Sequence, residues 1–91
     1  METVSRIGPL IEKNDLAGAM ELAQAALVLS PEDDMALVAI ADISLKQGRK
    51  AEALKFLERA IASNPAQKGQ LTRSKAFGSL ASDPEFQRLT H

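Results

Sequence analysis

The side chains that most often carry out catalysis are few in this 91-residue sequence, and they are scattered. The single histidine, His91, is the last residue, and there is no cysteine to act as a nucleophile or as a thiolate ligand. The five glycines stand too far apart to form a phosphate-binding loop. We interpret His91 as a solvated terminal residue. We therefore predict a protein that is not an enzyme and that binds no cofactor, no metal and no small-molecule substrate.

Two charged clusters allow a binding site, but a simpler interpretation is available for each. Asp33 and Asp34 are adjacent carboxylates, yet an oxygen-ligand loop needs acidic residues at alternating positions with a glycine turn. Negative charge is also favourable at the start of a helix, which is the interpretation we prefer. Lys68, Arg73 and Lys75 lack neighbouring aromatic residues and a larger basic face, so we interpret them as a solvated helix face rather than a nucleic-acid site.

Composition favours a helical, globular chain. Hydrophobic residues make up 45% of the sequence and aromatic residues only 3%, and alanine and leucine favour helices over sheets. No apolar run approaches the roughly 20 residues of a membrane span, and the N-terminus has no basic-then-apolar signal. Together with the lack of cysteine, these features lead us to expect a cytoplasmic protein that binds no membrane.

A period of 34 residues runs through most of the chain. Pro31 and Pro65 are separated by this interval, and so are Asn14 and Gly48, two residues suited to turns. The same shift aligns small or apolar residues with one another without a gap: Ala17 with Ala51, Ala19 with Ala53, Met20 with Leu54, Leu22 with Phe56, Ala26 with Ala60, and Leu27 with Ile61. Such self-similarity is typical of stacked helical repeats.

Helical spacing of apolar residues predicts helices over 16–29, 34–46 and 50–63. Asp15 is expected to cap the first of these, and Gly48 to take a left-handed conformation after the second. Before them, Gly8-Pro9 interrupts a potential helix, so we expect a kink or a late start between Thr3 and Pro9.

Beyond Pro65 the repeat pattern fades. Leu71, Phe77 and Leu80 predict one further helix. Asp83-Pro84-Glu85 then resembles a helix start, with a capping residue, a proline in the first position and an acid in the first turn. A short last helix is expected to carry Phe86 and Leu89 on one side.

These features resemble the tetratricopeptide repeat family. The stronger match is residues 34–67, which carry the family's pattern of apolar, small and turn residues: Leu37, Ile40, Ala41, Gly48, Ala53, Leu57, Ala60 and Pro65. Residues 1–33 match less well, because Arg6 and Ile7 occupy the places of Ile40 and Ala41. The resemblance implies a single all-α domain of antiparallel helix pairs, stacked as a short right-handed α-solenoid. We expect repeat one at about 1–33, repeat two at about 34–67 and C-terminal capping helices at about 68–91.

The resemblance also implies a concave face that binds peptides or helices. In that register the face carries Val4, Ile11, Met35, Val38, Asp42 and Leu45, an apolar groove with one acidic residue to anchor a ligand. Methionine suits adaptable surfaces, and an amphipathic helix is a natural ligand. The alternative is that some of these residues are core or are covered by the C-terminal helices. The lysines and asparagines with which some relatives hold a C-terminal carboxylate are replaced by Val4, Gly8 and Ala39, leaving only Arg73 to supply a cation.

The predicted function is a protein–protein interaction module, acting as an adaptor, a scaffold or a chaperone-like binder. The alternative is a structural module that self-assembles, or a fragment of a longer repeat array. Acidic residues predominate in 1–45 and basic ones in 46–91. The period aligns Glu12 with Lys46, Asp15 with Arg49, and Glu21 with Lys55, so we expect these pairs to lie side by side. Head-to-tail assembly into a homo-oligomer through such charges therefore stays open.

Overall fold

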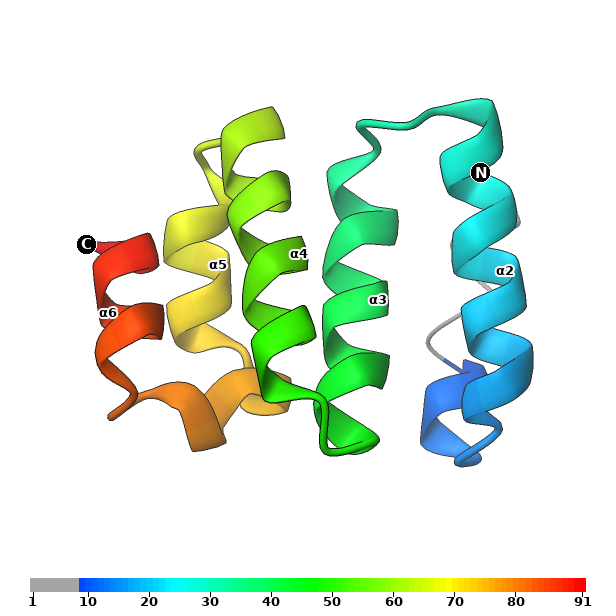
Figure 1. The fold of residues 1–91 in the computed structure, drawn as a ribbon, viewed down its shortest axis with the longest axis horizontal. Coiled ribbons are helices and arrows are strands. Elements are labelled where there is room, and N and C mark those ends of the chain that lie inside the picture. Colours follow the sequence, from blue (N-terminus) through cyan, green and yellow to red (C-terminus); the bar gives the residue numbers. More distant parts are fainter. Residues whose placement is uncertain (1–8) are drawn as a thin grey trace.

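A computed structural model of the chain describes residues 9–91, in which every regular element is a helix (Figure 1). Residues 9–12 are helical and are followed by α2 (Leu16–Leu29), α3 (Asp34–Lys46), α4 (Lys50–Ser63), α5 (Gln67–Arg73), the 3₁₀ helix η1 (Lys75–Leu80) and α6 (Pro84–Thr90). The predicted all-α fold is confirmed. The helices predicted over 16–29, 34–46 and 50–63 have these same bounds. The kink or late helix start was predicted between Thr3 and Pro9, and of these positions only Pro9 lies within the described residues.

Aspartate side chains begin three of the helices. Asp15 accepts a hydrogen bond from the amide of Gly18 (3.1 Å), and Asp33 accepts from the amides of Met35 and Ala36 (3.0 and 3.3 Å). Asp83 does the same for α6 (2.9 and 3.2 Å), directly before Pro84. Each side chain satisfies amide groups that the first turn of a helix leaves unpaired. The capping roles predicted for Asp15 and Asp83 are confirmed, as is a helix start at Asp33 and Asp34.

The period of 34 residues is also visible in the backbone. Asn14 has φ +64° and Gly48 has φ +79°, so both turns pass through the left-handed region at equivalent places. Glycine adopts this conformation without steric cost, and asparagine is among the residues that tolerate it best. The left-handed conformation predicted for Gly48 is confirmed.

The single helix predicted after Pro65 is wrong, because the structure has two short helices there, α5 and η1. Ser74 separates them in an extended conformation (φ −78°, ψ 130°), and its hydroxyl accepts from the amide of Ala76 (3.3 Å). A serine that caps the following turn competes with continuation of the preceding helix. Leu71, Phe77 and Leu80 are nevertheless all buried, as core residues of both short helices.

The interior consists of two apolar clusters. The cluster that we call the C-terminal core lies among α3, α4, α5, η1 and α6 and contains Ala41, Ala53 and Leu57, all fully buried. The N-terminal core lies between α2 and α3 and contains Ala19, Ala23, Ile40 and Ile43. Phe56 packs against both cores. Ala53 of α4 and Ala41 of α3 are thus buried in one cluster.

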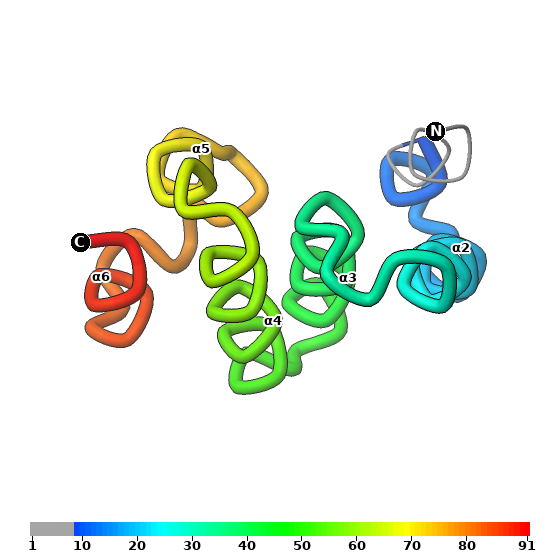
Figure 2. The backbone as a smooth tube through the Cα atoms, turned by 90° about the horizontal axis from the view of Figure 1, so that it is seen from above, coloured from blue at the N-terminus to red at the C-terminus, as the bar shows by residue number. Residues whose placement is uncertain are grey.

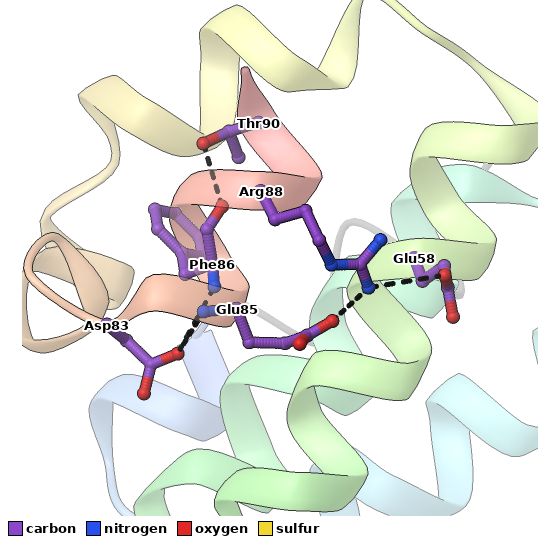
Figure 3. Close-up of polar contacts among 6 residues, drawn as sticks. All are labelled: Glu58, Asp83, Glu85, Phe86, Arg88 and Thr90. Carbon is purple, nitrogen blue, oxygen red and sulfur yellow. Dashed lines mark hydrogen bonds and ion pairs between the residues drawn. The ribbon is translucent and has the colours of Figure 1, made fainter.

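The last helix, α6, is held to α4 by both apolar and charged contacts (Figure 3). Phe86 and Leu89 are buried in the C-terminal core. Lys50, the first residue of α4, forms an ion pair with Asp83 and lowers the pKa of that carboxyl. Arg88 lies between Glu85 of its own helix and Glu58 of α4, the second at 4.0 Å. The C-terminal helix is therefore part of the folded core.

Seen from above (Figure 2), α3 lies between α2 and α4, residues 9–12 and α5 lie toward one side of the molecule, and α4 and α6 lie toward the other. One side of α3 packs against α2 in the N-terminal core, and another side packs against α4 in the C-terminal core. The handedness of the stack stays a prediction.

Polar contacts at the start of α3 join it to the end of α4 and to the start of α5. The Asp34 carboxylate accepts hydrogen bonds from the side-chain amides of Gln67 (2.6 Å) and Asn64 (3.0 Å). The Ser63 hydroxyl donates to the Glu32 carbonyl (2.5 Å). The Gln67 amide is the largest of the causes that lower the pKa of Asp34, followed on the same side by Asn64. Because these donors favour the ionised form, the network is strongest while Asp34 is charged.

We expect the stability contributed by Asp34 to depend on pH. Its pKa is lower in the folded than in the unfolded chain, so the contribution is complete above about pH 4, the unfolded value, and is lost as the pH falls through the folded value. The difference in free energy of unfolding between the parent and Asp34→Asn should therefore shrink in acid. Urea titrations from about pH 7 to pH 3 measure it. A difference independent of pH would contradict the assignment, and Glu32→Gln controls for general loss of negative charge nearby.

Candidate functional site

The predicted binding residues of the second repeat share one face of α3. Met35, Val38, Asp42 and Leu45 follow one another at spacings of three and four residues, which places them along one stripe of a helix. Other positions of α3 supply the buried residues, including Leu37, Ile40 and Ile43. We call this stripe the α3 strip.

Exposure varies along the α3 strip. Met35 is 57% exposed and is a large hydrophobic side chain open to solvent. Val38 and Leu45 are half-buried and pack against the C-terminal core. These two residues therefore combine a structural role with a partly accessible surface. The strip offers one open apolar side chain beside two that are partly covered.

Asp42 is already paired on its own helix. The Lys46 ammonium lies 2.7 Å from an Asp42 carboxylate oxygen, and the Asp42 side chain is only 15% exposed. The strip thus carries an ion pair where the sequence suggested a lone acidic anchor. Lys46 was not among the predicted site residues, although the spacing of four residues from Asp42 is the one at which helical charges meet.

The remaining predicted groove residues lie elsewhere. Ile11 is half-buried and packs against the N-terminal core, together with Ala39 of α3. Val4 lies outside the described residues. The structure therefore brings together four of the six predicted residues on α3 and places Ile11 in the helical residues 9–12, against the N-terminal core.

Gln67 borders the α3 strip and was not predicted. Its side chain is 4% exposed, and besides its bond to Asp34 its amide nitrogen lies 3.9 Å from the Met35 sulfur. A buried glutamine on a short helix has no pattern that marks it in the sequence. Its position fixes α5 beside the exposed end of the strip.

Two side chains of the basic cluster near the C-terminus donate hydrogen bonds to main-chain carbonyl oxygens. The Lys68 ammonium donates to the carbonyl oxygen of His91 (3.5 Å), and the Arg73 guanidinium donates to the carbonyl of Gly69 (3.0 Å). Lys75 is exposed on η1. Arg73, the one cation that we expected to be available for a bound carboxylate, is thus folded back on its own helix.

The ion pairs predicted between repeats are wrong. Lys46 pairs with Asp42, and Arg49 lies 3.8 Å from Glu52, while none of the three predicted pairs forms in the part of the chain that the structure describes. Residues three or four positions apart on one helix are close neighbours. These local partners are nearer than equivalent residues of the adjacent repeat.

Residues 9–91 include no helix that is long and apolar enough to cross a membrane. The same range has no group of three or more histidine, aspartate or glutamate side chains placed to hold a metal ion.

Comparison with known families identifies the repeat. A family model described as tetratricopeptide repeat matches residues 10–76, which includes all of α2 to α5. No solved structure matches the chain significantly.

Proposed function

Since this chain belongs to the tetratricopeptide repeat family, a family of repeats that generally mediate protein–protein interactions, we propose that its α3 strip binds a segment of a partner protein. The segment is a peptide or an amphipathic helix with at least one apolar side chain for Met35. The exposure of Met35, a large hydrophobic side chain on α3, is the observation that carries the proposal. Catalysis has no part in this function.

The chemistry of the α3 strip supports such a ligand. Methionine is flexible and polarisable, so it adapts to different apolar partners. Val38 and Leu45 extend the apolar surface on either side of the Asp42–Lys46 pair. A ligand helix with apolar residues at spacings of three and four can match this surface, and a polar group on it can bond to either member of the pair.

Val38→Glu is expected to weaken partner binding by about tenfold or more while the chain stays helical, because a carboxylate must then be desolvated in the interface. Val28→Glu is the matched control, since it is the same substitution at a side chain of α2 that is 81% exposed. Affinity capture from native cell extract, quantified by mass spectrometry with both variants, measures the effect. If captured proteins were lost equally with both variants, or with neither, the α3 strip would not be the binding surface.

Self-assembly is the second candidate function. Val28 and Leu29 are 81% and 85% exposed at the end of α2, and exposed apolar side chains of this kind occur at protein contacts. Sedimentation velocity over a range of concentrations separates the candidates. A constant monomer mass supports the adaptor, whereas a mass that grows with concentration and is restored to the monomer by Val28→Glu supports assembly.

A further inference from the structure

A second groove lies on the side of α3 away from the α3 strip. It has a volume of about 550 Å³ and is bounded by α2 on one side and α4 on the other. Ile40 and Ser44, both buried, line it from α3. We call it the α2–α4 groove. Figure 2 shows the three helices whose residues line it, with α3 between α2 and α4.

The two walls of the α2–α4 groove differ in charge. The α2 wall is formed by Met20, Gln24 and Leu27, and it has no charged residue. The α4 wall has a net positive charge, because it carries three cations, Arg49, Lys55 and Arg59, and one carboxylate, Glu52. Lys55 and Arg59 are exposed and form no ion pair with any described residue. The groove therefore combines an apolar surface on one side with positive charge on the other.

Two cations of the α4 wall also contact neighbouring side chains of the protein. Arg49 also lines the α4 wall, but it is partly neutralised by Glu52 at 3.8 Å. The Arg59 guanidinium lies over the Phe56 ring, 5.3 Å from its centroid. This cation–π contact covers the ring face, so the aromatic ring is not free to stack on a nucleobase. The apolar lining and the covered ring favour a protein ligand over a nucleic acid.

The groove is also elongated. A second hollow of about 260 Å³ shares Arg59 with it and continues past the end of α2, where Pro31, Leu37 and Ala62 are among its lining residues. A site that extends along two helices suits a peptide segment better than a compact small molecule.

From these observations we propose that the α2–α4 groove binds an acidic amphipathic segment of a partner protein. The aliphatic side chains of the bound segment lie against Met20, Leu27 and Ile40, and the carboxylates of the segment face Lys55 and Arg59. Complementary charge orients the segment, and the apolar side chains supply the buried area. This site is separate from the α3 strip and does not depend on it.

The test uses a fluorescent helical peptide of about 18 residues, with leucine at spacings of three and four and glutamate on one flank, and a control peptide with lysine in place of glutamate. Fluorescence anisotropy with the full chain should show binding of the acidic peptide only. Lys55→Glu should weaken it about five- to tenfold, whereas Lys75→Glu, which makes the same change in net charge on η1, should not. Gln24→Lys places a cation on the neutral wall and should tighten binding, a gain that misfolding cannot produce.

Mapping of backbone amide shifts with the acidic peptide locates the site. Shifts along α2 and α4 support the proposal, whereas shifts confined to the α3 strip would overturn it. No binding up to millimolar peptide, equal binding of the lysine peptide, or tighter binding of a single-stranded oligonucleotide would overturn it too. A monomer–dimer equilibrium abolished by Lys55→Glu would instead assign the groove to a second copy of this chain.

Discussion

Ala53→Glu is expected to destabilise the domain by about 3–5 kcal/mol, since it buries a carboxylate without a partner. Ala53 is fully buried in the C-terminal core together with Ala41 and Leu57, where α3 and α4 pack together. Stabilities of small domains are of the order of 5 kcal/mol, so this change should leave much of the protein unfolded. Thermal and urea unfolding followed by circular dichroism measure the loss.

The matched control is Ala51→Glu, two residues earlier on α4. Ala51 is exposed in the first turn, where negative charge is favourable, so this variant should equal or slightly exceed the parent in stability. If Ala53→Glu and Ala51→Glu had the same melting temperature, the conclusion that α3 and α4 pack closely at Ala53 would be wrong.

Phe86→Ala should destabilise the domain by about 3–5 kcal/mol, because it removes a large buried aromatic ring and leaves a cavity. Phe86 is 3% exposed and joins α6 to the C-terminal core. The same unfolding measurements apply.

Arg88→Ala serves as the control within α6, since exposed ion pairs contribute only about 0–1 kcal/mol. Equal melting temperatures of the two variants would show that α6 is dispensable to the core, contrary to the burial of Phe86 and Leu89 in it.

The sequence predicted the three long helices because their ends are marked by local chemistry. Asp15 and Asp33 cap helix starts with their own side chains, and Gly48 supplies a left-handed turn. The break at Ser74 was missed because Leu71 and Phe77 are compatible with one continuous helix. Serine has no conformation that its type alone dictates, and its cap depends on the turn that follows.

Only the part of the candidate site whose residues lie on a single helix could be predicted from the sequence. Register along α3 placed Met35, Val38 and Asp42 on one stripe, because spacing within a helix is fixed by its geometry. The α2–α4 groove was missed, since it depends on the distance between two helices. That distance is set by the packing of Ala23, Ile40 and Phe56 in three dimensions.

Phe56 has a consequence for how the domain unfolds. Among the described residues it is the one side chain that packs against both the N-terminal and the C-terminal core. In stacked repeats, cooperativity is set by the contact between neighbours rather than by the repeats themselves. The Phe56 ring therefore couples the unfolding of the two cores, and its loss would let one half of the chain unfold without the other. Because Arg59 lies over that ring at the edge of the α2–α4 groove, we expect that a ligand bound there would also affect the cooperativity of the whole domain.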